Sequence, residues 1–513
     1  MKFNEDSRQK NAMLASVFAI VEQVFSVASV FIYRTIFLSY LSKEYLGIEG
    51  LFTNILQLFS LAELGIGMTI LYRMYKPFSE KDVNAISAHV HFYKNVYHGI
   101  ALLTATIGGC LYPFIDSIVD ASDVPSDVNL RLVYVLFVLQ SVASYLFVYK
   151  QSIIQANQRA YLVSGFTTGL TIINVVVKVV VLMLTRKYEL VLMASIITTI
   201  LINWAFSLWI THEYKEIFQN PTTLAKEEKK DIVKDTTGLM CHKVGFIVLT
   251  STDNIILTKM VSLAATGIYT NYATITAAVQ MLLTKMLNSF TPTIGNFMVN
   301  YEKDAVEDLY KKLLFVNFWF TSFCTVCLYV LLNPFIEIWL DDTFLLSGFT
   351  VAVLCSQFYI KSSQTMNEAF INAAGLFTRD RVRPLIEASL NLVISIVLAK
   401  EIGIAGVFIG TCVSSLVTCY WRQPYLLYKH VFKNSPRHFV VNQIIWVVLT
   451  CVMCFVAQNV CQSIPITLLG FMVRLFVCGI GINLIYLVLW HRSSAFQYFF
   501  GIMMDKVKMI IKK

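Results

Sequence analysis

Residues 45–82 read YLGIEGLFTNILQLFSLAELGIGMTILYRMYKPFSEKD, and this stretch decides how we interpret the rest of the chain. A glycine-containing loop leads into an apolar helix that carries five polar side chains: Thr53, Asn54, Gln57, Ser60 and Glu63. The helix ends in a basic segment with Arg73 and Lys76. Because polar groups inside a membrane helix face protein or water rather than lipid, this stretch predicts a helix that lines a polar cavity.

A related stretch follows about 220 residues later in the chain. Gly267-Ile268 repeats Gly47-Ile48, and the Glu-Lys-Asp sequence of 302–304 repeats that of 80–82. Between them lies a row of hydroxyl and amide side chains, Tyr269, Asn271, Tyr272, Thr274, Thr276, Gln280 and Thr284. Two such helices that face each other would enclose a polar cavity inside a membrane.

Two further pairs of segments indicate that the chain arose by duplication. Residues 113–116 (PFID) match 334–337 (PFIE), and the segment Asn174–Trp204 matches Asn391–Trp421 with the same spacing between Asn and Trp. The pairs occur in the same order with similar offsets. A six-helix unit has both ends on one side of the membrane, so its copies would share one orientation and form a parallel repeat.

Composition places the chain in a membrane. Apolar residues make up 57% of its 513 residues and charged residues only 14%, which is too few charges to cover several soluble domains. We predict an all-α polytopic membrane protein with about fourteen transmembrane helices, arranged as two six-helix lobes plus two extra C-terminal helices. The predicted spans are 13–38, 48–72, 92–115, 130–149, 161–184, 189–211, 239–259, 266–291, 312–335, 346–373, 383–400, 404–427, 438–460 and 465–490.

The distribution of Lys and Arg predicts the orientation. The loops before odd-numbered spans and both chain ends carry most of the basic residues, so both termini are expected in the cytoplasm. The chain then divides into an N-terminal lobe (1–212), a cytoplasmic amphipathic linker (213–238), a C-terminal lobe (239–428), and two additional helices with a basic tail (429–513). The net charge of +9 lies mainly in one set of loops and does not indicate a nucleic-acid partner.

Charges inside the spans point to the functional site, because each costs roughly 2.5–3.5 kcal/mol to insert. We predict a cationic cavity that binds an anionic substrate through four residues: Arg34, Lys178, Lys285 and Lys361. The predicted polar lining of this cavity is Asn54, Gln57, Asn271, Gln280, Gln364 and Asn367. Candidates for ion coupling are Glu63, Asp253 and Glu368. Lys361 and Glu368 are seven residues apart and therefore share one helix face.

Internal pairing is the alternative for each of these charges. Arg34 could pair with Glu22 or Glu63, and Lys361 could pair with Glu368. The sequence predicts no catalytic residues, no metal site and no cofactor other than a coupling ion, Na⁺ or H⁺. Two CxxC pairs, at 324–327 and 451–454, lie within spans without a second ligand pair, so packing is the expected role of their thiols.

Two runs of residues carry a family resemblance. LGIEGLFTNILQLFSLAELGIG with the following YKPFSEKD, and STDNIIL (251–257) followed by GIYTNY (267–272), resemble the Wzx-type polysaccharide and O-antigen repeat-unit flippases. These belong to the multidrug/oligosaccharidyl-lipid/polysaccharide (MOP) exporter superfamily. The resemblance implies V-shaped lobes, alternating access without ATP hydrolysis, and an undecaprenyl-diphosphate-linked oligosaccharide as substrate. It also implies location in the bacterial cytoplasmic membrane and a place in surface polysaccharide or lipopolysaccharide biosynthesis, with other polysaccharide-assembly proteins as partners.

Two other functions stay open from the sequence. A cation-coupled multidrug antiporter of the same superfamily would bind Na⁺ or H⁺ at Asp253 or Glu63. A polytopic glycosyltransferase or polymerase would need a large external loop or an acidic metal motif. The predicted external loops are short, and Asp341-Asp342 is their only adjacent acidic pair, so the sequence favours a transporter over an enzyme.

Overall fold

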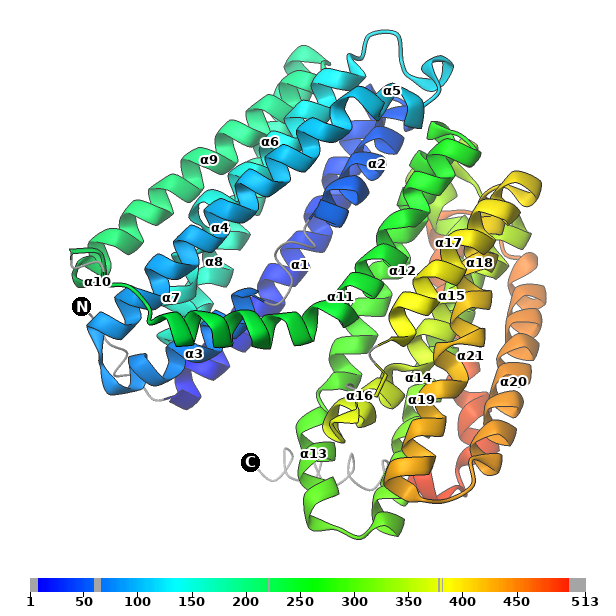
Figure 1. The fold of residues 1–513 in the computed structure, drawn as a ribbon. Coiled ribbons are helices and arrows are strands. Elements are labelled where there is room, and N and C mark those ends of the chain that lie inside the picture. The colour runs from blue at the N-terminus through cyan, green and yellow to red at the C-terminus, as the bar shows by residue number, and fades with distance from the viewer. Residues whose placement is uncertain (1–7, 60–65, 220–221, 377–378, 381, 498–513) are drawn as a thin grey trace. The chain divides into compact units, whose positions relative to one another are not determined.

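The computed structural model describes residues 8–59, 66–219, 222–376, 379–380 and 382–497 (Figure 1). Within these ranges the chain is helical and contains no strand, which confirms the predicted all-α class. Nine helices of the described residues are long and apolar enough to cross a membrane. They are Met13–Tyr40, Val83–Ile118, Leu130–Val148, Ala160–Thr185, Tyr188–Glu213, Lys303–Trp339, Ile404–Phe432, Arg437–Gln462 and Leu468–Trp490.

The remaining predicted spans also form helices, but these are shorter or more polar. The predicted second span corresponds to two helices, α2 (Lys43–Phe59) and α3 (Ile66–Glu80), while Glu63 lies outside the described residues. The predicted tenth span is interrupted at Gln364, between α15 (Gly348–Ser363) and α16 (Thr365–Ala373). The helices that depart most from a simple apolar span are therefore the ones that carry the predicted polar lining.

The chain forms two compact units, Met1–Gly267 and Ile268–Lys513, and each is described by itself. Unit 1 contains, besides α2 and α3, the helices α1 (Arg8–Tyr40), α4 (Val83–Leu111), α5 (Ile115–Ile118), α6 (Leu130–Val148), α7 (Gln151–Ala156), α8 (Ala160–Thr185), α9 (Tyr188–Glu213), α10 (Lys215–Gln219) and α11 (Lys226–Met260). Helix α12 (Leu263–Asn288) begins in unit 1 and continues into unit 2. The predicted division into two lobes, a linker and a C-terminal addition stays a prediction.

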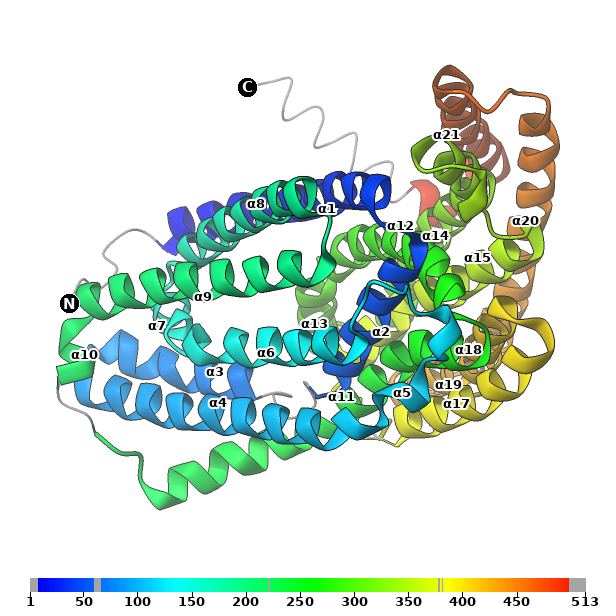
Figure 2. The same cartoon turned by 90° about the horizontal axis from the view of Figure 1, so that it is seen from above.

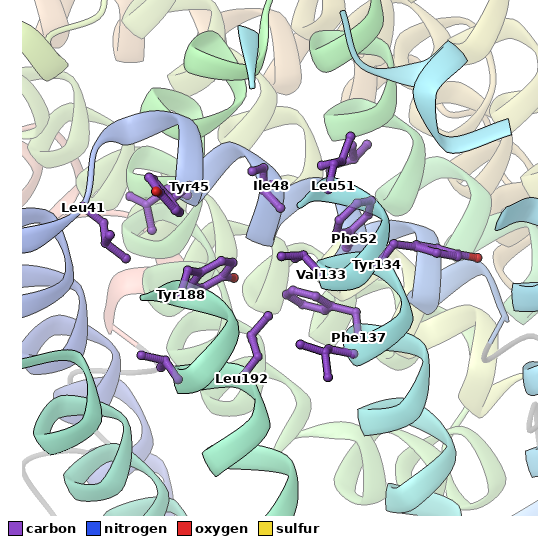
Figure 3. Packing of buried hydrophobic residues seen from close by; sticks show 14 of the residues in the cluster. Leu41, Tyr45, Ile48, Leu51, Phe52, Val133, Tyr134, Phe137, Tyr188 and Leu192 are labelled. Carbon is purple, nitrogen blue, oxygen red and sulfur yellow. The ribbon is translucent and has the colours of Figure 1, made fainter. Parts of the chain in front are cut away.

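One hydrophobic core of unit 1 joins α1, α2, α6 and α9 (Figure 3). Tyr188 at the start of α9 packs edge-on against Phe37 and Tyr45, with ring centroids 5.6 Å apart in both pairs. Phe52 of α2 contacts the rings of Tyr134 and Phe137 on α6, with ring centroids 5.4 and 5.6 Å apart. Aromatic side chains bury large apolar areas, so this cluster fixes α2 against the neighbouring helices.

A second core of unit 1 joins α3, α4 and α7 to the segment around α10. Tyr93 and Tyr97 of α4 contact each other edge-on at 4.6 Å, and Tyr214 after α9 accepts a hydrogen bond from the Asn157 amide over 2.8 Å. The first turns of α11 lie beside α3 and α4 in both views of the ribbon (Figures 1 and 2). The segment that connects the two halves of the sequence is thus packed against unit 1.

The first turns of α2 and α12 approach each other at the backbone level. A β-carbon added to Gly47 would overlap the carbonyl oxygen of Leu263, and one added to Gly267 would overlap the carbonyl oxygen of Lys43. Nearby, the Leu263 amide donates to a carboxylate oxygen of Asp123 over 3.2 Å. Only glycine permits this approach, because any larger side chain would push the two helices apart.

Unit 2 continues with α13 (Thr291–Asn300), α14 (Lys303–Trp339), α15, α16, α17 (Arg383–Ile402), α18 (Ile404–Val417), α19 (Cys419–Leu427), a π-helical turn (Tyr428–Phe432), α20 (Arg437–Gln462) and α21 (Leu468–Trp490). The last two helices pack on α14. Phe318 of α14 stacks on Trp446 of α20 with ring centroids 4.7 Å apart. The Trp319 indole donates a 2.8 Å hydrogen bond to Asn483 of α21. Aromatic and polar contacts therefore fix the C-terminal helices to this unit.

Matching asparagines support the repeat that we inferred from the sequence. Asn174 of α8 bonds to the hydroxyl groups of Ser195 and Thr199 on α9, each over 3.0 Å. Its counterpart Asn391 on α17 donates to the hydroxyl of Thr411 on α18 over 2.8 Å. Each unit thus uses an asparagine to link the corresponding pair of helices, where an unpaired amide would be costly.

Candidate functional site

In unit 1 two of the four predicted cations lie on helices that pack against each other, α1 and α8. Arg34 of α1 is buried, and the ammonium nitrogen of Lys178 on α8 lies 5.0 Å from the ring centroid of Tyr33, the residue before Arg34. Helices α1 and α8 pack along each other, which places these side chains in one neighbourhood. A cation over an aromatic face is attracted by the ring quadrupole, so Tyr33 positions Lys178.

A carboxylate that the sequence analysis did not select lies close to this pair. Glu49 of α2 interacts electrostatically with both Arg34 and Tyr33. The internal-pairing alternative for Arg34 therefore has a partner in Glu49. With two cations and one carboxylate, the formal charge of this cluster of Tyr33, Arg34, Glu49 and Lys178 is +1. We call it the Arg34–Lys178 cluster.

The other predicted residues of unit 1 lie on α2 and α11. Asn54 is half-buried and Gln57 is exposed, so neither side chain belongs to the buried aromatic core that packs against α2. Asp253 of α11 is buried, and the amide of its neighbour Asn254 donates a 3.2 Å hydrogen bond to the Gly50 carbonyl oxygen. That bond fixes α11 against α2 and leaves Asp253 inside the protein.

In unit 2 the interruption at Gln364 organises a network of amides and hydroxyls. Asn367 accepts a 2.7 Å hydrogen bond from the Tyr310 hydroxyl and donates to Gln364 over 2.8 Å. The Ser362 hydroxyl donates to Gln280 of α12 over 2.8 Å. Gln280, Gln364 and Asn367 were all predicted as polar lining, and here their amides join α12, α14, α15 and α16. We call these contacts the Gln364 network.

Lys361 and Glu368 lie on either side of the buried network residues in the sequence. Both side chains are exposed in unit 2, whereas residues 362–367 between them are buried. Lys361 also acts electrostatically on Glu368. The predicted common face of these two residues stays a prediction, because the helix is interrupted between them. Lys285 of α12 is likewise exposed, while Asn271 near the start of that helix is fully buried.

A buried ionic cluster at the start of α17 was missed by sequence reasoning. Arg383 donates to Asp380 over 2.7 Å and to Glu387 over 2.5 Å, and both carboxylates are buried. The Ser415 hydroxyl donates to the second oxygen of Glu387 over 2.6 Å. The spacing Asp380, Arg383, Glu387 is a signal for helix-face pairing that the sequence did contain. No group of His, Cys, Asp and Glu suited to a metal ion occurs among the described residues.

Comparison with known proteins agrees with this architecture. A model of the family described as "Polysaccharide biosynthesis protein" matches residues 9–298, more than half of the 513 residues. The chain belongs to this family. No curated protein matches this polysaccharide biosynthesis family member.

Solved structures of MOP transporters share the fold of this polysaccharide biosynthesis protein. The lipid II flippase MurJ, in an inward closed conformation, has a TM-score of 0.66 at 12% identity and covers 93% of this chain and 99% of its own. A multidrug resistance MATE family transporter in an inward-facing conformation has a TM-score of 0.59 at 14% identity. The match covers 82% of this chain and 99% of the transporter. A single-residue variant of the Vibrio cholerae MATE transporter VcmN has a TM-score of 0.55 at 14% identity. The match covers 84% of this chain and 100% of that transporter. The chain is therefore a multi-pass membrane protein with the MOP fold.

Proposed function

We propose that the protein is a flippase that moves an undecaprenyl-diphosphate-linked oligosaccharide repeat unit across the bacterial cytoplasmic membrane. It would do so by alternating access, as a transporter rather than an enzyme, with both termini in the cytoplasm. The product would serve the assembly of a surface polysaccharide such as O-antigen. Membership of the polysaccharide biosynthesis family supports this role, as does the fold that the protein shares with a lipid II flippase.

The observation that carries the proposal is the Arg34–Lys178 cluster. A diphosphate needs cationic partners away from bulk water, and Arg can hold it through two parallel hydrogen bonds while Lys supplies a mobile point charge. Glu49 acts electrostatically on Arg34, while Lys178 lies over the ring of Tyr33. Lys285 and Lys361 are the proposed cations of unit 2, where both side chains are exposed.

The Gln364 network supports the sugar part of the proposal. Moving hydroxyl groups through hydrocarbon costs several kcal/mol each when they lack partners. Amide and hydroxyl side chains on α12, α15 and α16 can replace water for these groups. Asn54, Gln57 and Asn271 are the further polar residues that we assign to the path.

Coupling to a Na⁺ or H⁺ gradient is part of the proposal. Asp253, buried on α11, and Glu368, exposed on α16, are the described carboxylates that we assign to it, and Glu63 stays a candidate from the sequence. A cation-coupled drug antiporter is the second candidate function, favoured by the buried Asp253 and by the MATE fold. The net positive Arg34–Lys178 cluster disfavours cationic drugs as its substrates.

Complementation of a bacterial strain that lacks its own repeat-unit flippase tests the proposal. Arg34→Ala and Lys178→Ala are expected to abolish surface polysaccharide at unchanged protein abundance. Arg186→Ala is the matched control, because Arg186 also lies over a tyrosine ring, 5.7 Å from that of Tyr40, but at the end of α8. Full complementation by both variants would exclude the cationic role. Drug resistance without polysaccharide export would favour the antiporter instead.

A reconstituted assay addresses the substrate directly. Proteoliposomes that contain the purified protein and a defined undecaprenyl-diphosphate-linked sugar should show transbilayer movement of that lipid. Imposed Na⁺ and H⁺ gradients, applied separately, would identify the coupling ion. Movement that proceeds equally in protein-free liposomes would contradict the proposal.

A further inference from the structure

Unit 1 contains a second polar site, separate from the Arg34–Lys178 cluster. A cavity of about 870 Å³ opens between α3, α4 and the beginning of α11. This volume falls within the range of cavities that bind small molecules. Most of the lining residues lie in segments that we predicted to be cytoplasmic (73–91 and 213–238), so the cavity would open toward the cytoplasmic surface of the membrane.

Basic side chains converge on this cavity from two helices. Arg73 and Lys76 lie one helical turn apart on α3, and His89 of α4 also lines the cavity. Lys76 pairs with Glu80 at 3.9 Å, but both side chains are mostly exposed, and such pairs contribute little energy. The Lys76 ammonium can therefore turn toward an anion in the cavity at small cost.

Two tyrosines and several hydroxyl groups complete the lining. The side chains of Tyr72 and Tyr75 are 76% and 45% exposed, and their rings meet edge-on at 6.5 Å. Exposed aromatic rings next to polar groups offer an apolar face for a sugar ring and hydrogen bonds for its hydroxyls. Such a combination would be unusual for a surface that only contacts water.

The segment before α11 closes one side of the cavity. A carboxylate oxygen of Glu228 lies 3.1 Å from Nε2 of the His89 imidazole. The His89 side chain is almost fully buried. The Thr222 hydroxyl donates a 2.6 Å hydrogen bond to the Asn84 carbonyl oxygen of α4. These two contacts tie the connecting segment to the cavity wall.

We propose that this cavity is a docking site for a glycosyl diphosphate, in which the phosphates contact Arg73, Lys76 and His89 and the first sugar lies against Tyr72 and Tyr75. The inference rests on the proposed function, because it assigns the head group of a lipid-linked sugar as the ligand. The diphosphate of such a lipid lies at the level of the membrane surface, where this cavity opens. Docking would therefore precede transfer to the Arg34–Lys178 cluster.

Binding would also act on the segment that connects the units in sequence. An anion next to His89 competes with Glu228 for the same imidazole nitrogen and repels the Glu228 carboxylate. Because Glu228 lies in the first turn of α11, its displacement would loosen the start of that helix. The docked ligand would thereby be coupled to movement of the connecting segment.

Protection of a single cysteine from chemical modification tests the proposal without measuring transport. Thr223 lines the cavity and is exposed, so Thr223→Cys in a background without the native cysteines should react with a water-soluble maleimide. Farnesyl-diphosphate-linked N-acetylglucosamine should slow this reaction at least tenfold. Adding Arg73→Ala or the exposed Lys76→Ala should remove the protection. Lys230→Ala, on the same segment but outside the cavity, should keep it.

Two further ligands test whether the site recognises a glycosyl diphosphate or any phosphate group. Inorganic pyrophosphate alone should protect at least tenfold less well than the sugar-linked probe, and nanodiscs of phosphatidylglycerol should not protect. Equal protection by either would overturn the assignment to a glycosyl diphosphate, and absence of protection by the sugar-linked probe would overturn the site itself. Arg34→Ala should retain protection while it loses transport. Failure of the proposed function and failure of the docking site are thus separate outcomes.

Discussion

Gly47 and Gly267 occupy equivalent positions in the two copies of the repeat, and each lies against the backbone of the residue four positions before the other. Gly47 meets the carbonyl of Leu263, and Gly267 meets the carbonyl of Lys43. The contact is reciprocal and lies within unit 1, since each glycine leaves room for the backbone of the other helix. The duplicated glycines of the sequence are therefore explained by one contact between them.

Gly47→Ala is expected to lower the stability of the protein, because the added methyl group overlaps the Leu263 carbonyl oxygen and forces α2 away from α12. Overpacking of this kind costs about 1–3 kcal/mol. Gly169→Ala on α8 is the matched control, since a β-carbon there meets no neighbouring atom within 4 Å. The measurement is thermal unfolding in detergent. A control that melts as early as Gly47→Ala would contradict the close contact.

The free energy of unfolding should depend on pH through Tyr45, at the start of α2. Burial and the 2.7 Å hydrogen bond to Asp127 raise the pKa of the Tyr45 phenol well above its ordinary value of about 10. The stabilising form is the protonated phenol, so its contribution is complete below pH 10 and is lost as the pH rises further. Tyr45→Phe should cost about 1–2 kcal/mol at pH 8 and weaken the alkaline loss of stability. Identical alkaline melting curves for both proteins would contradict this account.

Asn174→Leu and Asn391→Leu should each lower stability by about 1 kcal/mol, because each removes the amide that links two helices. The two asparagines share no partner, so their effects in the double variant should add. Asn459→Leu is the control, since the exposed Asn459 bonds only to its own helix at Phe455. Thermal melting of the purified variants measures all three effects. Strong non-additivity would contradict two independent links.

Arg383→Met should destabilise unit 2 by about 3 kcal/mol, because it removes the arginine that bonds to the buried carboxylates of both Asp380 and Glu387, while Asp380 keeps its 3.6 Å pair with Arg422. The exposed Arg379 provides the control, as Arg379→Met removes the same charge from a surface position. Protein yield and melting temperature should fall for the first variant only. Similar values for the two variants would show that the buried ionic cluster contributes little.

Exposed and buried positions around the interruption at Gln364 should differ in chemical reactivity. In a background without native cysteines, Lys361→Cys and Glu368→Cys should react with a small water-soluble maleimide, because both positions are exposed. Asn367→Cys, which replaces a fully buried side chain, should react much more slowly. Mass spectrometry of the labelled protein measures the extent of reaction. Equal rates at the three positions would contradict the burial of Asn367.

Much of the fold could be predicted from sequence because it depends on apolar periodicity and on repeats. The apolar spans and the match between Asn174 and Asn391 follow from spacing along one helix or between the matching segments. The polar amides Gln280, Gln364 and Asn367 were also recognised, because such groups are rare inside apolar helices.

Partners across helices could not be predicted in the same way. Glu49 of α2 acts on Arg34 of α1 through the tertiary fold, and the sequence contains no signal for that pairing. The cavity between α3, α4 and the start of α11 likewise depends on segments more than 130 residues apart, as the bond from Thr222 to Asn84 shows. Tertiary packing decides which charges meet, whereas the sequence pattern decides only which charges are inside.

The interruption at Gln364 and the polar character of α12, α15 and α16 have a consequence for biogenesis. Helices that carry so many amides and charges partition poorly into lipid on their own, so they would have to leave the translocon together with an apolar neighbour. Substitutions that replace these polar residues with leucine should then increase the yield of inserted protein while they remove the hydrogen-bonding groups of the transport path. Natural sequences of this kind would balance efficient insertion against the chemistry of the substrate.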